Sequence, residues 1–330
     1  MQKKLKIAIV GASGLVGRTV LKVLEEYSFE DVSYILFSSK KSAGSKVTFL
    51  GKEYFVYELK ESSFDLNFDY AIFCAGCDVS KNFIPLAISS GCTVIDNSSF
   101  YRMNPTVPLV VPEVNISEIE KNIGIIANPN CSTIQAALAL KPLDDNYKIK
   151  RIVYSTYQAV SGAGKSGIED LINENTDSDL KKFPYPIFNN CLPHIDSFLS
   201  DGYTKEEYKM INETRKILNE PDLPITVTAV RVPVINCHCE SINVELENDF
   251  DLLDIKDLFD ASPGITLLDS PEDLIYPIPS IVDGKDDVFV GRIRRDFSVD
   301  FGLNLWVVAD NLRKGAALNA VQILDYLINS

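Results

Sequence analysis

The stretch that decides the fold reads Gly11-Ala-Ser-Gly14-Leu-Val-Gly17 and joins an apolar run at residues 5–10 to a helical pattern at residues 16–27. Backbone N–H groups at a glycine-rich turn of this kind face outward, and the helix dipole attracts a phosphate there. The glycines are spaced GxxGxxG rather than GxGxxG, so the spacing alone is a weak signal. The position of the turn between a strand and a helix makes a nucleotide-binding site the better interpretation.

Outward from this turn, the first 130 residues alternate between strand-like and helix-like patterns. Such alternation predicts a parallel sheet wrapped by helices, which is a Rossmann-type domain. The further strands are expected at residues 32–37, 70–74, 93–96 and 123–127, and a further helix at residues 79–90.

The sequence pattern changes after about residue 148, where long runs rich in β-forming residues follow one another. These runs lie at residues 151–158, 225–234, 241–247, 288–294 and 303–308, with one clear helix at residues 205–219. Successive strands predict an antiparallel or mixed sheet in a second domain, and a last helical pattern at residues 314–328 is expected to return to the first. We therefore predict an α/β protein with a Rossmann-type parallel sheet domain (residues 1–130 plus 309–330) and an α+β domain with a large mixed sheet (residues 131–308).

The composition is that of an ordinary globular protein with an acidic surface. Of the 330 residues, 46% are apolar and 24% are charged, which excludes a disordered chain. Because 46 acidic residues outnumber 32 basic ones, for a net charge of −14, we expect no nucleic-acid partner and no anionic membrane surface. A small anionic substrate remains compatible with this charge, because it meets a local pocket rather than the whole surface.

Cysteine usage and hydropathy predict a cytoplasmic protein. Seven cysteines, an odd number in a long chain, do not form the pattern of a disulfide framework. No stretch approaches the roughly 18 consecutive apolar residues of a membrane span. We therefore expect a reducing compartment and no membrane.

The residues after the second strand bear on the choice of dinucleotide. Sites specific for NAD place an acidic residue there for the ribose hydroxyls, whereas this chain has Ser38-Ser39-Lys40-Lys41-Ser42. A 2′-phosphate would be attracted by the lysines and repelled by an acid. The sequence therefore favours NADP, and an ordinary solvated lysine pair is the open alternative.

The most informative stretch is Asn128-Pro-Asn-Cys131-Ser-Thr, which ends a strand-like run and starts an apolar helical pattern. Asn130 can cap the helix, which places Cys131 in its first turn. The helix dipole favours a thiolate at that position, so Cys131 is a candidate nucleophile. The alternative is a buried cysteine in the core, which the polar neighbours make less favourable.

Two other cysteine motifs invite a redox or metal interpretation. Cys74-Ala-Gly-Cys77 resembles a redox CxxC, but it is expected to end a strand rather than begin a thioredoxin-like helix, so we assign it to packing. In Cys237-His238-Cys239, alternate side chains of an extended segment point apart and cannot easily share one metal. We therefore predict no metal site.

The chain has only two histidines, His194 and His238, so an imidazole base must be one of them. His238 follows Arg231 by seven residues, but Pro233 interrupts the alternation, so strand parity does not decide whether the two face one pocket. Arg102 follows the fourth strand, where ligands gather in open α/β sheets. Glu206 and Lys209 share one helix face, where a solvated surface is the default interpretation.

Taken together, these segments resemble the aspartate-semialdehyde dehydrogenase family nearly from end to end. The NPNCST stretch, the VIDNSS stretch followed by Arg102, and the pair Arg231 and His238 are highly specific in combination. The resemblance covers residues 11–17, 41–44, 94–102, 110–115, 128–133, 158–164, 209–217, 231–240, 288–294 and 304–322.

The resemblance implies a reaction, a cofactor and an assembly. Enzymes of the family reduce L-aspartyl 4-phosphate to L-aspartate 4-semialdehyde with NADPH and release inorganic phosphate, in the route to lysine, methionine and threonine. The first domain would then bind NADP, and the second would serve catalysis and dimerisation. We expect a homodimer or a tetramer.

The resemblance also assigns roles to single residues. Cys131 would be the nucleophile, His238 the acid–base catalyst, and Gln158 would orient the acyl intermediate. Arg231 would bind the substrate α-carboxylate and Glu206 the α-ammonium. The residues expected to hold the leaving phosphate are Arg102, Lys209 and Asn130; those expected at NADP are Gly11, Ser13, Gly14, Leu15, Val16, Lys41, Ser42, Ser161, Gly162 and Asn311.

Three positions depart from the usual pattern of the family. Lys41 stands where Arg is usual, and Cys237 and Cys77 stand where Gly is usual. The closest rival function is an acyl-phosphate reductase similar to N-acetyl-glutamyl-phosphate reductase, whose blocked amine would leave Glu206 without a purpose. A non-catalytic dinucleotide sensor would not need Cys131, His238 and Arg231 together.

Overall fold

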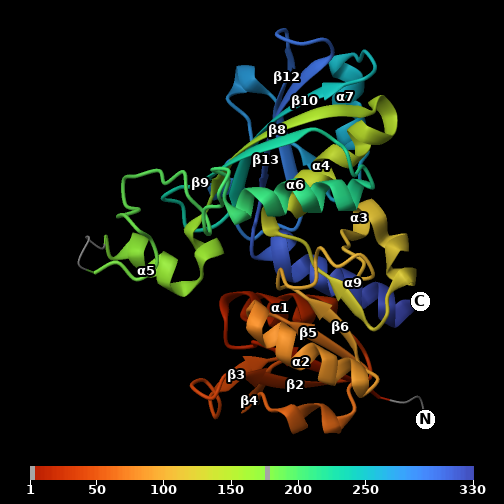
Figure 1. The fold of residues 1–330 in the computed structure, drawn as a ribbon, viewed down its shortest axis with the longest axis vertical. Helices are drawn as coiled ribbons and strands as arrows, with labels where there is room; N and C mark the ends of the chain where they lie inside the picture. Colours follow the sequence, from red (N-terminus) through yellow and green to blue (C-terminus); the bar gives the residue numbers. More distant parts are fainter. Residues whose placement is uncertain (1–3, 175–178) are drawn as a thin grey trace. The chain divides into compact units, whose positions relative to one another are not determined.

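The computed structural model describes residues 4–174 and 179–330. The chain divides into two compact units, and Figure 1 shows it coloured along the sequence. Unit 1 comprises Met1–Pro129 and Ala316–Ser330, and unit 2 comprises Asn130–Gly315. One unit contains a seven-stranded sheet and the other a six-stranded sheet. The predicted fold class is confirmed, with a Rossmann-type sheet in unit 1 and a mixed sheet in unit 2.

The sheet of unit 1 has the strand order β3-β4-β2-β1-β5-β6-β7. Every neighbouring pair is parallel except β3 and β4, which form an antiparallel hairpin at one edge that the sequence patterns did not predict. The strands are β1 (Leu5–Val10), β2 (Val32–Ser38), β3 (Lys46–Phe49), β4 (Lys52–Glu58), β5 (Tyr70–Phe73), β6 (Thr93–Asp96) and β7 (Ile125–Ala127).

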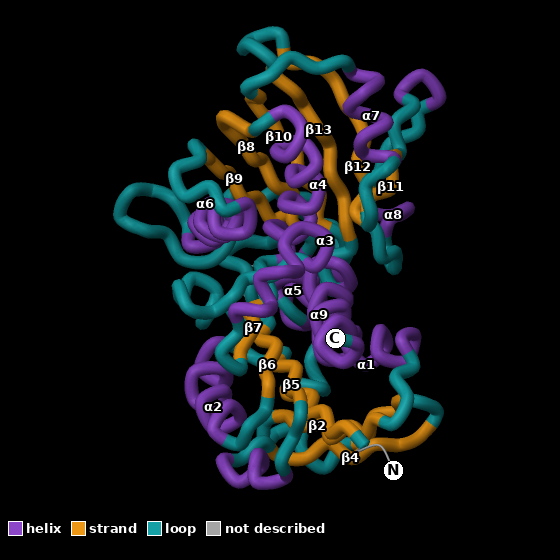
Figure 2. The backbone as a smooth tube through the Cα atoms, turned by 90° about the vertical axis from the view of Figure 1, so that its right-hand side faces the viewer, coloured by secondary structure: helices purple, strands orange, loops and turns teal. Residues whose placement is uncertain are grey.

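Helices cover both faces of this sheet (Figure 2). On one face, α1 (Leu15–Tyr27) and α9 (Leu318–Asn329) bury Val20, Leu24 and Leu324 against the strands. The opposite face carries α2 (Cys77–Ser89). Three short elements complete the unit: η1 (Glu61–Leu66), α3 (Pro112–Asn115) and η2 (Ile116–Lys121). The last helix of the chain therefore belongs to the same compact unit as the first strand.

The sheet of unit 2 has the order β11-β12-β13-β10-β8-β9. β10 is antiparallel to both of its neighbours, whereas β8 and β9 are parallel, as are β11 and β12. The strands are β8 (Ile149–Gln158), β9 (Ile225–Arg231), β10 (His238–Leu246), β11 (Ile265–Leu267), β12 (Val288–Asp296) and β13 (Gly302–Ala309).

Two strand boundaries in unit 2 differ from the prediction and matter for the site. β9 ends at Arg231 rather than at residue 234, because Pro233 cannot donate to a strand ladder. β10 begins at His238 rather than at residue 241, directly after Cys237, whose φ of +71° interrupts the extended backbone. Arg231 and His238 are thus the last and first residues of two strands.

One face of the mixed sheet is covered by the long helices α4 (Cys131–Tyr147) and α6 (Lys205–Leu218) together with α7 (Leu252–Asp260) (Figure 1). The shorter helical elements are η3 (Val160–Ala163), α5 (Lys165–Ile172), η4 (Pro271–Asp273), α8 (Pro279–Val282) and the π-helical turn η5 (Arg313–Ala317). Among the described residues, no helix is both long and apolar enough to cross a bilayer.

The other face of this sheet, the open face, carries none of these long helices among the described residues; at one end Val282 of α8 packs on it with Cys239 and Val308. Tyr157 and Trp306 lie on it with their ring centroids 5.5 Å apart. They line a pocket of about 480 Å³ together with Arg292 and Arg294 from β12. Around this pocket the side chains of Tyr157, Ser241 and Trp306 are half-buried or exposed, which is typical of a surface that meets a partner.

Candidate active site

Cys131 is the first residue of α4, as the capping pattern predicted. The side chain of Asn130 accepts hydrogen bonds from the N–H groups of Ser132 (3.0 Å) and Thr133 (3.4 Å), which caps the helix. The half-buried thiol therefore lies in the first turn, where the positive end of the helix dipole stabilises a thiolate.

His238 faces this sulfur directly. Its Nε2 lies 3.2 Å from Sγ of Cys131, while its Nδ1 accepts the backbone N–H of Ala159 at 3.0 Å. Because Nδ1 accepts, the neutral ring carries its proton on Nε2, on the side of the sulfur. Burial lowers the pKa of His238 well below its usual value, and the nearby Arg231 lowers it further. The pair can therefore hold a thiolate next to an uncharged hydrogen-bond donor.

The structure decides between the two histidines, which the sequence patterns did not. His194 stacks its ring on Phe198, with centroids 4.3 Å apart. His238 is fully buried and adjoins Cys131. Only His238 is in a position to exchange a proton with the thiol.

Arg231 and Gly162 lie beside this pair. The guanidinium of Arg231 is buried and donates from Nη1 to the carbonyl of Ala159 at 2.7 Å. A Cβ atom at Gly162 would come within 2.9 Å of Nη1 and 3.2 Å of the His238 ring, so a side chain at this position would displace the guanidinium or the imidazole. Burial lowers the pKa of Arg231, although Glu206 opposes that shift. The other guanidinium nitrogens are available for an anion.

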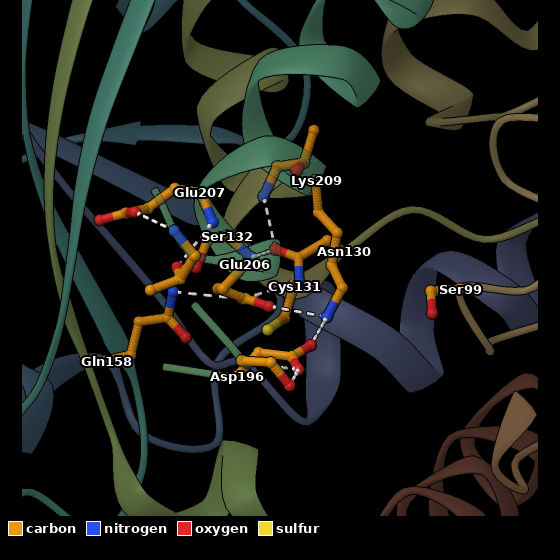
Figure 3. Close-up of polar contacts among 12 residues, drawn as sticks. Ser99, Asn130, Cys131, Ser132, Gln158, Asp196, Glu206, Glu207 and Lys209 are labelled. Carbon is orange, nitrogen blue, oxygen red and sulfur yellow. Dashed lines mark hydrogen bonds and ion pairs between the residues drawn. The ribbon is translucent and has the colours of Figure 1, made fainter. Parts of the chain in front are cut away.

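Gln158 and Asn130 converge on one carboxylate, that of Glu206, as Figure 3 shows. Gln158 is the last residue of β8 and pairs in register with Arg231 on β9. Its Nε2 lies 3.3 Å from Oε1 of Glu206, and Nδ2 of Asn130 lies 2.9 Å from the same oxygen. Residues from three elements thus meet within hydrogen-bonding distance in front of Cys131.

Lys209 completes this group from the next turn of α6 (Figure 3). Its ammonium lies 3.1 Å from Glu206 and 2.7 Å from Asp196. Burial by itself would raise the pKa of Glu206, but Lys209 and Asn130 outweigh it and hold that pKa below its usual value. Burial would likewise lower the pKa of Lys209, yet the two carboxylates raise it. The default interpretation of a solvated pair is therefore wrong, because Glu206 is only 5% exposed.

Ser161 and Asn311 form a second polar pair in unit 2. The side-chain amide of Asn311 donates to Oγ of Ser161 at 2.9 Å, and its oxygen accepts the N–H of Cys237 at 2.9 Å. Both side chains are buried. Asn311 thereby fixes the residue directly before His238 on β10.

The glycine-rich turn in unit 1 has the form that a dinucleotide phosphate requires. Gly11 has φ of +86°, and a Cβ there would lie 2.6 Å from the carbonyl oxygen of Cys74. α1 begins after Gly14 without a side-chain cap, so the first N–H groups of the helix are left for a ligand. The other predicted contacts, Ser13, Leu15 and Val16, belong to the turn and the first turn of α1.

Three further predicted residues of unit 1 lie at the carboxyl ends of its strands. Lys41 and Ser42 are in the turn that follows β2, and Lys41 is exposed. Arg102 is buried and donates to the carbonyl oxygens of Asn128 (2.9 Å) and Asn97 (2.8 Å). Its backbone partners hold the guanidinium in place near the end of β6.

Several residues that position the site were missed by sequence analysis. Asp196 pairs with Lys209, and Oε2 of Glu213 accepts the N–H of Asn130 at 2.6 Å. Ala159 binds His238 through its N–H and Arg231 through its carbonyl. For Glu213 a signal existed, because acids at 206 and 213 interrupt the buried face of α6 with helical spacing. Asp196 lies in an irregular turn, and Ala159 acts through its main chain. Neither role produces a recognisable sequence pattern.

The assignment of the CxxC motif to packing is wrong for one of its cysteines. Cys77 begins α2 and is exposed, with Sγ 3.2 Å from Oγ of Ser99. Cys74 is partly buried, and burial raises the pKa of its thiol to about 12. The strand ends one residue earlier than predicted, at Phe73, which leaves room for the helix to start at Cys77.

One group among the described residues has the atom types of a metal site. The sulfur of Cys237 and carboxylate oxygens of Asp283 and Asp310 lie within 4.8 Å of one another. Asp310 already accepts backbone N–H groups from Leu312 (2.8 Å) and Gly284 (2.9 Å), so it serves the loop that precedes η5. The expectation of no metal site stays a prediction.

Comparison with known proteins follows the same division of the chain. Residues 6–122 match the family described as semialdehyde dehydrogenase, NAD binding domain, and residues 140–314 match semialdehyde dehydrogenase, dimerisation domain. The aspartate-semialdehyde dehydrogenase of Aquifex aeolicus is 51% identical over 98% of each chain. This chain belongs to the aspartate-semialdehyde dehydrogenase family.

Solved structures of aspartate-semialdehyde dehydrogenases have a backbone fold similar to that of this chain. Aspartate semialdehyde dehydrogenase II of Vibrio cholerae, complexed with ASA, has a TM-score of 0.94 at 43% identity and covers 100% of this chain and 99% of its own. The enzyme of Candida albicans with NADP has a TM-score of 0.78 at 26% identity, with 98% of each chain covered. The prediction of an enzyme is thereby confirmed: the chain is an oxidoreductase of amino-acid biosynthesis with an NAD(P)-binding domain.

Proposed function

We propose that this chain reduces L-aspartyl 4-phosphate to L-aspartate 4-semialdehyde with NADPH, through a thioester on Cys131, in the biosynthesis of lysine, methionine and threonine. The observation that carries the proposal is the 3.2 Å approach of His238 Nε2 to Cys131 Sγ at the N-terminus of α4. The acid and the guanidinium beside this pair match a substrate with a free α-amino group and a free α-carboxylate.

Substrate recognition follows from the charges of Arg231 and Glu206. Arg231 binds the α-carboxylate, because a guanidinium fork fits the two carboxylate oxygens. Glu206 binds the α-ammonium, and Lys209 keeps it ionised for that purpose. An N-acetylated substrate has no ammonium and would leave the buried carboxylate of Glu206 without a ligand.

The first chemical step needs a thiolate and a good leaving group. Sγ of Cys131 attacks the acyl carbon, the bond from that carbon to the phosphate oxygen breaks, and phosphate leaves with the electron pair. Lys209 has three N–H donors, of which two face Glu206 and Asp196, so one remains for a phosphate oxygen. The side chain of Gln158 orients the resulting thioester.

The second step makes and then removes negative charge on the carbonyl oxygen. The chemistry that NADPH supplies when bound is a hydride for the thioester carbon. His238 donates its Nε2 proton as a hydrogen bond to the oxyanion and then to the departing sulfur, since Ala159 keeps Nδ1 as an acceptor. Collapse of the oxyanion re-forms the carbonyl group, breaks the C–S bond and returns the thiolate.

The residues of unit 1 fit a dinucleotide phosphate by the geometry of Gly11 and the uncapped start of α1. We propose that this turn holds the pyrophosphate and that Lys41 and Ser42 hold a 2′-phosphate, which selects NADP over NAD. A lysine offers a point charge rather than a planar fork, so discrimination by Lys41 is expected to be less strict than by an arginine. The roles of Arg102, Ser161, Gly162 and Asn311 stay predictions.

The test of this function is the reverse reaction, followed as NADPH formed from aspartate 4-semialdehyde and inorganic phosphate. We expect turnover that requires phosphate and prefers NADP to NAD. N-acetylglutamate semialdehyde serves as the competing substrate in parallel. Turnover of the acetylated substrate alone would overturn the substrate assignment, and equal rates with NAD would overturn the cofactor preference.

Replacing Arg231 tests the carboxylate site. Arg231→Leu should raise KM for aspartate 4-semialdehyde by about 10- to 100-fold, the value of one or two charged hydrogen bonds, with a smaller change in kcat. Arg231→Lys keeps the positive charge but lacks the two-pronged guanidinium group, so its KM should lie between that of wild type and that of Arg231→Leu. Steady-state kinetics measure both constants, and an unchanged KM in the leucine variant would remove the binding role.

We propose that the open face of the mixed sheet joins two copies of the chain. Residues 140–314 match a dimerisation domain, and the face carries Tyr157 and Trp306, a residue class enriched at interfaces. Light scattering coupled to gel filtration should therefore give twice the chain mass of 36.7 kDa or more. Trp306→Glu should reduce that mass, and a monomeric wild-type protein would contradict the proposal.

A further inference from the structure

Gln135 lies one helical turn beyond Cys131 on α4, so both side chains project from the same helix face. Its Nε2 donates to the backbone carbonyl of His238 at 3.3 Å. His238 is thus held on its ring by Ala159 and Cys131 and on its main chain by Gln135. The same helix that carries the sulfur therefore also sets the position of the strand residue that faces it.

Glu240 lies beneath His238, two residues further along β10 and on the same face of the strand. Its exposed fraction is 0%, and its carboxyl adjoins the Gln135 amide. Within the described residues, neither carboxyl oxygen of Glu240 has a hydrogen-bond partner, and the same holds for Oε1 of Gln135. Three buried acceptor atoms are thus gathered here without a donor, which is costly unless a proton is present.

The groups around Glu240 do not supply a positive charge. On β8 it pairs with Thr156, and Tyr154 on the same strand is a neighbouring titratable group, whose pKa is raised by burial and further by Glu240. On β10 the titratable neighbours are His238 and Cys239, and burial raises the pKa of Cys239 to about 12.

The remaining elements packed against Glu240 are equally uncharged at this point. On β13 its partner in the ladder is Val307, and α4 presents Gln135 together with Cys131. Burial therefore raises the pKa of Glu240 well above its usual value, and the contact with Gln135 opposes this only in part. Among the described residues no lysine or arginine forms an ion pair with it.

We propose that Gln135 and Glu240 form a buried, uncharged clamp that positions His238 against Cys131, with Glu240 acting as a neutral carboxylic acid that donates a hydrogen bond to the Gln135 amide. The proposal rests on the proposed role of His238 as partner of the thiolate. The carboxyl oxygens of Glu240 and the amide oxygen of Gln135 are all acceptors without a partner, and a proton on the acid supplies the donor that joins them. Both are positioning residues, because neither touches the reacting atoms.

The kinetic test compares two replacements of Glu240 with a matched control. Glu240→Gln keeps a neutral side chain with a donor, so kcat for oxidation of aspartate 4-semialdehyde should stay within about threefold of wild type, well below the loss expected from misplacing a catalytic group. Glu240→Leu removes the donor and should lower kcat by about 10- to 100-fold, with little change in KM. Glu247→Gln makes the same change at an exposed site just beyond β10 and should leave kcat unchanged.

Two measurements do not depend on the substrate and keep this proposal separate from the proposed function. The rate of Cys131 alkylation by iodoacetamide, followed against pH, reports the His238–Cys131 contact; its profile should shift in Glu240→Leu and not in Glu240→Gln. Infrared difference spectroscopy should find the carbonyl stretch of a protonated, non-exchanging carboxylic acid in wild type and not in Glu240→Gln. These results stand even if another semialdehyde proves to be the substrate.

Thermal unfolding gives a further readout with a definite sign. Above the usual glutamate pKa of about 4.3, the unfolded chain ionises Glu240 while the folded chain keeps the proton, so this group lowers stability progressively as pH rises. Glu240→Gln lacks this term, and its Tm relative to wild type should therefore increase between pH 5 and about pH 8. Glu247→Gln should show no such trend.

Three outcomes would overturn the proposal. Equal kcat losses in Glu240→Gln and Glu240→Leu would mean that a carboxylate charge is needed. Wild-type kinetics and an unshifted alkylation profile in Glu240→Leu would mean that the clamp does not position His238. A missing carboxylic-acid band would mean that Glu240 is ionised. Should Glu240→Leu fail to fold, Gln135→Met replaces it, with the same expected loss of kcat and the same shift in alkylation.

Discussion

Cys131→Ala should abolish the phosphate-dependent oxidation of aspartate 4-semialdehyde, with a loss of roughly 10⁴-fold or more in kcat. The reason is that every proposed covalent step passes through its sulfur, and among the described residues the cysteine in contact with His238 Nε2 is Cys131. The fold should be retained, because Asn130 caps α4 through the backbone N–H groups of residues 132 and 133. Residual turnover would then come only from binding and polarisation of the substrate.

The experiment has a direct covalent readout beside the rate. Wild-type enzyme mixed with L-aspartyl 4-phosphate in the absence of NADPH should gain the mass of an aspartyl group, seen by intact-protein mass spectrometry. Cys131→Ala should gain no mass while showing an unchanged circular dichroism spectrum. Cys191→Ala, an exposed cysteine of the same unit, is the matched control and should behave as wild type. Near-normal turnover in Cys131→Ala would contradict the thioester mechanism.

His238→Asn should lower kcat by about 10²- to 10⁴-fold, the usual contribution of a positioned acid–base group. The imidazole is held as an Nε2–H donor by the N–H of Ala159, and asparagine cannot reach the sulfur from the same backbone position with both contacts kept. KM should change much less than kcat, because the substrate charges are bound by Arg231 and Glu206. His194→Asn is the matched control and should leave kcat unchanged.

The pH dependence of this variant follows from the lowered pKa of His238. Below about pH 6.5 the unfolded chain protonates this histidine while the folded chain keeps it neutral, so the wild type loses stability as pH falls. His238→Asn lacks this group and should be less sensitive to acid, measured as Tm between pH 7 and about pH 5. A loss of kcat below about tenfold would mean that water, rather than His238, supplies the proton.

Local patterns in the sequence predicted most of the strands and helices of unit 1 and the position of the nucleophile Cys131. The glycine-rich turn, the alternation of strands and helices, and the cap at Asn130 all depend on neighbours within a few residues. Such signals are readable because the backbone period and the capping groups are local. The hairpin of β3 and β4 escaped detection because both strands are largely exposed, so they lack a regular alternation of apolar and polar residues.

Position within the tertiary structure decided the rest of the site. His238 meets Cys131 across 107 residues of sequence, and no periodicity links them. Glu206 and Lys209 carry the helical spacing of a surface pair, and only the packing of α6 on the mixed sheet buries them. Asp196 forms an ion pair with Lys209 from a turn in which its own φ is +68°. No sequence pattern predicted this turn.

The sequence by itself therefore determined the strand–turn–helix that suits a nucleotide, the two-sheet architecture and the helix N-terminus that carries Cys131. Only the tertiary structure decided which histidine serves the sulfur, which acids are buried, and that Gln135 and Glu240 lie behind His238. The physical reason is that propensities and caps act over one or two turns of chain. The charge and protonation of a side chain depend instead on which distant elements exclude water around it.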